Sequence, residues 1–264
     1  MNRIVRSAGC ALFFSVALSA FAAAPASSPF DGTWHIELAK TKFSPKPLSF
    51  YIGHGWYHCI TCNPTFTVPA DGQDHAVTGQ AYDSISVKIV DPHTISTTVS
   101  KNGKVIGEQT RTVSDNGKVL TVKGTDHSMD GDKTSTYGAI AKRSGMAPAD
   151  VELASGDWII EKESGSENGL ITVYKLDGDD LTMSAPTGET YTAKLDGGDF
   201  PVKGAYGWDT VSLKKINAHS IEETDKRGGT VTDVSTMTVA GKTMTIVDNN
   251  KLTDRTSTYV AHKD

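Results

Sequence analysis

The side chains best suited to chemistry gather in one short segment, residues 54–62, which read HGWYHCITC. Histidine and cysteine are ligands that Zn and Cu accept, so the segment could bind a metal through four side chains: His54, His58, Cys59 and Cys62. In an oxidising compartment a Cys-x-x-Cys pair more simply forms a local disulfide. Thiol–disulfide exchange is a third interpretation, but it requires the first cysteine at a helix N-terminus, and this segment has the pattern of strand or loop. A Cys59–Cys62 disulfide is therefore favoured, and a Zn or Cu site is the alternative.

Aromatic side chains form the second group of candidates, because they combine a large apolar area with a polar edge. Four of them lie near glycines in segments that precede a strand, where they could rim a ligand cavity or cap a core: Trp56, Tyr57, Tyr206 and Trp208. Trp34 and Trp158 each follow a glycine by two positions, and we expect them to fill the base of a core. His93 and His219 fall in predicted turns, where a histidine is usually solvated.

No established catalytic pattern accompanies these residues. The sequence lacks Gly-x-Ser-x-Gly, His-Glu-x-x-His, a phosphate-binding glycine loop, and a Gly-x-Gly-x-x-Gly placed between a strand and a helix. Acidic groups such as Asp177, Asp179 and Asp180 lack the alternating oxygens and terminal glutamate of a calcium loop, so we expect them in turns. The sequence assigns no catalytic residue and favours a non-enzymatic protein.

An internal duplication supplies the elements that must position these residues. Residues 83–113 and 209–239 align without a gap and share 11 identities in 31 positions. Ordinary residue frequencies would give about two identities by chance. The alignment predicts a first unit at 29–143, a linker at 144–153 and a second unit at 154–264.

The candidate segment 54–62 interrupts this internal symmetry. In the second unit the corresponding interval, 171–195, has the pattern of a plain hairpin without cysteine or histidine. We therefore expect segment 54–62 to have no counterpart, and we expect any function specific to one unit to lie there.

Both units have the pattern of antiparallel strands. Polar and apolar side chains alternate in residues 84–88 and 210–214, as they do in a strand with one buried face. Turn dipeptides such as Asn102-Gly103 recur at strand-length intervals and suit hairpins. We expect an all-β protein of two tandem antiparallel up-and-down β-barrel or sandwich units, each with roughly eight to ten strands.

The N-terminal residues predict the compartment. Arg3 and Arg6 precede an apolar run, and Ala20-Phe21-Ala22 suits cleavage by signal peptidase. The run is shorter than the ~20 apolar residues that span a membrane. We expect a signal peptide at 1–22, a periplasmic or secreted location, and no stable membrane anchor.

Composition excludes several other classes of protein. The 31 Asp+Glu against 26 Lys+Arg give a net charge of −5, which argues against a nucleic-acid partner. A chain of 264 residues with 38% hydrophobic content can bury its own core, which argues against intrinsic disorder. Three cysteines, one of them within the signal peptide, are too few for a disulfide scaffold. The fold must therefore be stabilised by packing.

The opening strand of each unit carries a family resemblance. Gly32 and Trp34 in the first unit, and Gly156 and Trp158 in the second, form a Gly-x-Trp pattern. This pattern resembles the calycin superfamily of lipocalins and fatty-acid-binding proteins, and implies an up-and-down barrel that can enclose a small apolar ligand. The Arg-x-Tyr with which fatty-acid-binding proteins hold a carboxylate is absent. With its Lys40-Thr41-Lys42-Phe43 stretch, the chain also resembles exported bacterial proteins of uncharacterised activity.

These observations predict an exported, non-enzymatic β-barrel module that binds a small apolar ligand or serves as a structural protein of the cell envelope. The alternative is a periplasmic metal-binding or thiol redox module built on segment 54–62. Neither interpretation implies a resident cofactor beyond Zn or Cu, and the sequence identifies no protein partner. It also leaves open whether the two units exchange strands.

Overall fold

The computed structural model describes residues 27–127, 133–146 and 151–264. Regular structure in these ranges is almost entirely β-strand, with two short 3-10 helices, η1 (Leu38–Lys40) and η2 (Glu167–Gly169). Neither of these described helices has the length and apolar character of a membrane-spanning segment. The prediction of an all-β protein with two antiparallel units is confirmed. The predicted signal peptide lies outside the described residues.

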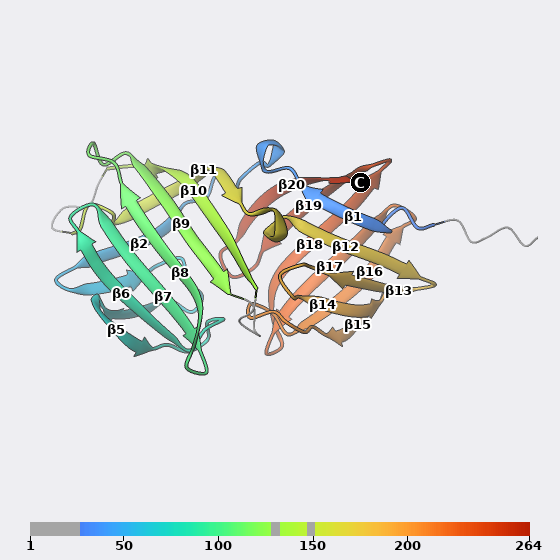
Figure 1. Cartoon of the computed structure of the whole chain (residues 1–264), viewed down its shortest axis with the longest axis horizontal. Helices are drawn as coiled ribbons and strands as arrows, with labels where there is room; N and C mark the ends of the chain where they lie inside the picture. Colours follow the sequence, from blue (N-terminus) through green and yellow to red (C-terminus); the bar gives the residue numbers. More distant parts are fainter. Residues whose placement is uncertain (1–26, 128–132, 147–150) are drawn as a thin grey trace, which may run out of the picture.

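The strands form two antiparallel sheets of ten strands, and each sheet curls into a nearly closed barrel (Figure 1). Barrel 1 contains, in spatial order, β4 (Phe66–Pro69), β3 (Trp56–Cys59), β2 (Leu48–Gly53), β11 (Gly156–Gly165), β10 (Thr134–Ser144), β9 (Val119–His127), β8 (Lys104–Val113), β7 (Thr94–Lys101), β6 (Ser84–Asp91) and β5 (Asp71–Ala76). Barrel 2 contains β14 (Thr190–Lys194), β13 (Asp180–Ser184), β12 (Ile171–Asp177), β1 (Gly32–Ile36), β20 (Arg255–Lys263), β19 (Thr243–Asn250), β18 (Thr230–Ala240), β17 (Ser220–Arg227), β16 (Thr210–Asn217) and β15 (Asp196–Pro201).

The two repeat units exchange their opening strands. Strand β1 of the first unit pairs with β12 and β20, and so completes barrel 2. Strand β11 of the second unit pairs with β2 and β10, and so completes barrel 1. In Figure 1 the blue β1 lies beside the red β20, although the two strands come from opposite ends of the sequence. Each barrel thus depends on a strand from the other unit.

The exchanged strands carry the tryptophans that fill the two cores. Trp34 and Trp158 are each 1% exposed. The indole Nε1 of Trp34 donates to the carbonyl of Phe30 at 2.8 Å, and that of Trp158 donates to Ala154 at 3.0 Å. A buried indole N–H requires such a partner, so each ring has a defined place.

A cation covers each tryptophan ring. Arg143 places its guanidinium carbon 4.2 Å from the centroid of a Trp158 ring, and Lys263 places its Nζ 5.5 Å from a Trp34 ring. Arg143 also donates to three carbonyl oxygens at 2.5 Å, those of Gly117, Leu153 and Ser155. The base of barrel 1, which we define as the end holding Trp158, is closed by this arginine.

Segment 54–62 does have a structural counterpart, so the expectation of an unmatched segment was wrong. Strands β2, β3 and β4 follow one another across barrel 1 as β12, β13 and β14 do across barrel 2. The interval 171–195 therefore forms three strands where we expected one plain hairpin. Sequence comparison missed the match because the two segments share strand topology but few side chains.

The barrels meet along the segment that follows β1. Lys42 forms a β-bridge with Thr258 of β20, and the Lys46 ammonium pairs with the Asp254 carboxylate in the β19–β20 turn. Elsewhere along the junction, Arg227 of barrel 2 donates to the carbonyl oxygen of Gly79 in barrel 1 at 2.9 Å. The Lys46–Asp254 ion pair fastens the β19–β20 turn to the segment that leads into barrel 1, and the other two contacts join the barrels elsewhere.

Candidate functional site

The interior of barrel 1 contains a cavity of about 630 Å³ that is open at one end. This volume lies within the range of small-molecule binding sites. Apolar side chains line its lower part, at the base: Phe50, Leu120, Ala141, Trp158 and Ile160. Polar side chains line the opposite end of the cavity. We call this end the mouth of barrel 1 and define it by Asp126 and Glu163. The cavity is thus apolar at its base and polar above it.

Strand periodicity explains how a charged residue enters this interior. On β8 the side chain of Val113 belongs to the buried core, so Arg111 and Gln109 point to the same inner face. Arg111 lies opposite Val122 of β9 in the ladder, one step above Leu120. The guanidinium therefore lies just above the apolar base.

Arg111 is held by a chain of hydrogen bonds inside the cavity. Its Nε donates to Gln109 Oε1 at 2.5 Å, and its Nη1 donates to the hydroxyl of Tyr57 at 3.2 Å. Gln109 in turn donates from Nε2 to the hydroxyl of Tyr137 at 2.9 Å. The guanidinium carbon lies 4.6 Å from the centroid of the Phe50 ring. Three neighbours, Gln109, Tyr57 and Phe50, therefore orient the guanidinium.

Within the described ranges this cation has no carboxylate partner, because the guanidinium contacts an amide, a phenol and an aromatic ring. A guanidinium carries five N–H donors, and two of them are used here. The remaining donors can bind an electronegative group that enters the cavity. Arg111 is a candidate site residue that the sequence patterns did not single out.

Burial shifts the acidity of the groups nearer the mouth. It raises the pKa of Asp126 and of Glu163, although Arg255 of barrel 2 opposes the shift at Glu163. Burial also raises the pKa of Tyr137, and the nearby Asp126 carboxylate adds to the effect. For Tyr82 burial raises the pKa to about 12. Burial thus disfavours the charged forms of these groups, and Arg111 is the one basic side chain among the described residues that line the cavity.

A glycine makes room for one member of the network. A Cβ added to Gly124 would lie 2.2 Å from Cζ of Tyr137, which pairs with Gly124 across the β9–β10 ladder. The Tyr137 ring can lie against the inner wall only because that position has no side chain. Gly124 thus allows Tyr137 to reach Gln109.

Cys59 and Cys62 form a disulfide at the wall of the cavity. Both sulfurs are therefore in the oxidised form, and the metal site predicted as an alternative would first require their reduction. His58 contacts Thr67 through Nδ1 at 2.9 Å, and His54 occupies the exposed β2–β3 turn with a φ of 52°. Among the described residues, no cluster of three or more His, Cys, Asp or Glu side chains is arranged to hold a metal ion.

The four aromatic candidates fall in different places. Tyr57 faces the cavity and is 3% exposed, whereas Trp56 lies on the other face of β3 and is 47% exposed. Trp208 packs edge-on against Tyr191 in barrel 2, with ring centroids 5.9 Å apart. Tyr206 lies in the loop between β15 and β16. The structure brings one of the four, Tyr57, into the cavity of barrel 1.

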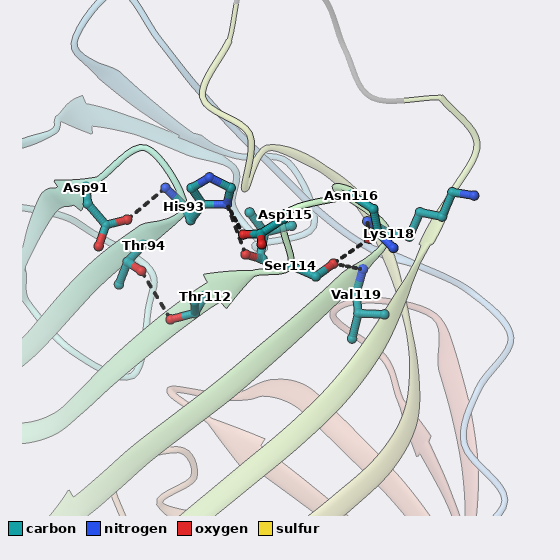
Figure 2. A network of polar contacts seen from close by, with 10 residues as sticks. Asp91, His93, Thr94, Thr112, Ser114, Asp115, Asn116, Lys118 and Val119 are labelled. Carbon is teal, nitrogen blue, oxygen red and sulfur yellow. Dashed lines mark hydrogen bonds and ion pairs between the residues drawn. The ribbon is translucent and has the colours of Figure 1, made fainter.

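His93 belongs to a network of turn contacts at the base of barrel 1 (Figure 2). Its backbone N–H donates to Asp91 Oδ1 at 2.8 Å, and its ring Nδ1 lies 3.3 Å from the carbonyl oxygen of Val113. The matching residue His219 has the same backbone contact, with Asn217 Oδ1 at 2.8 Å. Both histidines stabilise hairpin turns and lie away from the cavity.

The interior of barrel 2 has a different set of polar side chains. Four carboxyl groups lie on the inner face of three adjacent strands: Glu223, Asp225, Asp233 and Asp248. Tyr191 donates to Glu223 Oε2 at 2.5 Å, and Ser235 donates to Asp248 Oδ1 at 2.8 Å. Burial raises the pKa of Glu223 to about 7 and, with help from the neighbouring Glu223 charge, that of Asp225 to about 9.

Fold and cavity together define a two-barrel β protein with a ligand-sized interior. No family model matches the chain, and no curated protein is similar to it. The geometry of barrel 1 is therefore the basis for assigning a function.

Proposed function

We propose that the protein is an exported, non-enzymatic binding module that holds one small, largely apolar molecule in barrel 1, with an electronegative end at Arg111. The observation that carries this proposal is an oriented guanidinium, without a carboxylate partner in the described chain, inside a cavity of about 630 Å³. A half-buried cation with unused donors favours an anion or a strong acceptor.

The remainder of the cavity fits the apolar part of such a molecule. Each CH₂ group moved from water to the apolar side chains level with Arg111, such as Val122, Ala139 and Ile160, would contribute about 0.8 kcal/mol. A short alkyl chain or a ring system would therefore supply most of the affinity. Arg111 would supply orientation and selectivity.

The test uses the purified protein, freed of bound lipid by organic extraction and refolded. It is titrated with anilinonaphthalenesulfonate, a fluorophore with an apolar ring system and one anionic group. The fluorophore is then displaced with a straight-chain carboxylate and with the alcohol of the same chain length. We expect the carboxylate to compete more strongly than the alcohol.

Arg111→Met is the decisive variant, because Met237 occupies the equivalent position in barrel 2. We expect it to weaken carboxylate binding by roughly tenfold to a hundredfold, which is the typical contribution of a hydrogen bond to a charged group. Alcohol binding should change less. Lys88→Met, which removes an exposed cation from the outer face of β6, is the matched control.

Two results would overturn the proposal. The first is failure of the wild-type protein to bind either the fluorophore or the carboxylate. The second is an Arg111→Met variant that binds carboxylate and alcohol as the wild type does.

A further inference from the structure

The mouth of barrel 1 is bordered by residues from three segments that cross the junction between the barrels. Leu38 comes from η1, Leu170 follows η2, and Leu252 lies in the β19–β20 turn of barrel 2. All three line the cavity, together with Asn250 and Thr253 of the same turn. The wall of the cavity is therefore shared between the two barrels.

The three leucines belong to neither hydrophobic core. Leu38, Leu170 and Leu252 are each half-buried, and none packs into the core cluster of barrel 1 or of barrel 2. A half-buried leucine that faces a cavity gains free energy when an apolar molecule covers it. These side chains form an apolar rim above the polar groups of the interior.

The β19–β20 turn holds Leu252 in a fixed position. Asn250 Oδ1 accepts hydrogen bonds from the Thr253 backbone N–H at 2.9 Å and from its hydroxyl at 2.7 Å. The Lys251 N–H donates to the carbonyl oxygen of Thr232 at 2.7 Å, which ties the turn to β18. The Lys46–Asp254 ion pair fastens the same turn to the segment leading into barrel 1.

We infer that barrel 2 completes the binding site of barrel 1, and that Leu252 contacts the end of the bound molecule remote from Arg111 and limits its length. This inference rests on the proposed function. The molecule would lie along the barrel axis, with its electronegative end near Arg111 and its apolar chain passing the polar groups to reach the rim. Ligand selectivity would then depend on a residue of the second barrel.

The test measures how affinity depends on chain length. A homologous series of straight-chain carboxylates, from short to long, competes with anilinonaphthalenesulfonate for the full-length protein. Leu252→Trp should shift the preferred length toward shorter chains and weaken binding of the longest carboxylate by about tenfold. A loss of this size is typical of a mismatch of a methylene or two in an apolar pocket. Leu252→Ala should extend the preference toward longer chains.

Val247→Trp and Val247→Ala are the matched controls, because Val247 is 41% exposed on the outer face of the same hairpin. Both should keep the wild-type length preference. If Leu252→Trp does not fold, Leu252→Ala alone decides the question. Length preferences identical to the wild type in the folded Leu252 variants would overturn the inference and leave the proposed function standing. Absence of binding by the wild type would overturn both.

Discussion

The two barrels share one strand order but differ in the charged side chains of their interiors. Barrel 1 places one arginine above an apolar base and two carboxyl groups, Asp126 and Glu163, at its mouth, whereas barrel 2 places four carboxyl groups among its inner side chains. Strand pairing identifies the equivalent positions of the two barrels. Arg111 pairs with Val122 in barrel 1, and Met237 pairs with Ile246 at the same place in barrel 2. The duplication has thus preserved the framework while the inward positions have diverged.

Each inner carboxyl of barrel 2 replaces a small or uncharged residue of barrel 1. The pairs of equivalent positions are Thr97 and Glu223, Val99 and Asp225, Gly107 and Asp233, and Gly124 and Asp248. The small side chains of barrel 1 leave space for Tyr137 and for the cavity. This difference is consistent with the binding role proposed for barrel 1.

The largest effect should come from removing a tryptophan on an exchanged strand. Trp34→Ala should destabilise barrel 2 by about 3–5 kcal/mol, as expected for a buried Trp. Because β1 belongs to the sheet of barrel 2, amide hydrogen exchange should accelerate in β12–β20 and much less in β6–β9. Accelerated exchange confined to β2–β10 would contradict the exchange of strands.

The second effect is a dependence of stability on pH that is specific to barrel 2. Burial raises the pKa of Glu223 from 4.5 to about 7 and that of Asp225 from 3.8 to about 9. The native state therefore keeps protons that the unfolded chain releases, so stability is greatest below about pH 4 and declines as the pH rises to about 9. We expect the decline to reach roughly 2 kcal/mol or more.

Thermal unfolding monitored across this pH range measures the decline. The double variant Glu223→Gln with Asp225→Asn should flatten the dependence. The matched variant Asp71→Asn, which removes an exposed carboxyl from barrel 1, should not flatten it. An unchanged slope in the double variant would refute the assignment to these two groups.

A third prediction concerns the glycine that accommodates Tyr137. Gly124→Ala places a methyl group where the Tyr137 ring lies, so the ring must move away from Gln109. We expect a loss of about 2 kcal/mol in stability, as in other overpacked interiors, together with weaker carboxylate binding. Urea unfolding and the displacement assay measure the two effects. Gly103→Ala, in an exposed turn, should leave binding unchanged.

The smallest effect should follow loss of the disulfide. Cys59 and Cys62 are separated by three positions in the sequence, so their bond closes a short loop and constrains the unfolded chain little. Cys62→Ser should cost about 1 kcal/mol in the free energy of unfolding. Because both cysteines line the cavity, fluorophore affinity should change as well. A loss as large as that of Trp34→Ala would show that the bond stabilises the whole barrel.

The fold class was predictable because it depends on local patterns. Polar and apolar side chains alternate in residues 84–88 and 210–214, and this pattern indicates which face of each strand is buried. The dipeptide Asn102-Gly103 indicates a hairpin turn, and both residues have positive φ in the structure. The exchange of β1 and β11 was not predictable, since alternation does not identify the neighbouring strand. Because the two units are alike, an opening strand would meet similar side chains whether it paired within its own unit or with the other unit.

The candidate site was only partly predictable. Tyr57, Cys59 and Cys62 line the cavity and were candidates from sequence. Arg111 was missed because the comparison of the two units searched for identities, and Arg111 is aligned with a methionine. The available signal was a charged side chain at an inward position of a strand, two residues before the buried Val113.

A ligand bound as proposed lies in barrel 1, against Arg111 and the β19–β20 turn. The most direct measurement is cross-linking with a straight-chain carboxylate that carries a photoreactive group at its apolar end, followed by mass spectrometry of the peptides. We expect labelling at Leu252 and its neighbours in the turn, and a marked reduction of that labelling in Arg111→Met. Labelling of the inner strands β16–β18 of barrel 2, unaffected by Arg111→Met, would contradict this expectation.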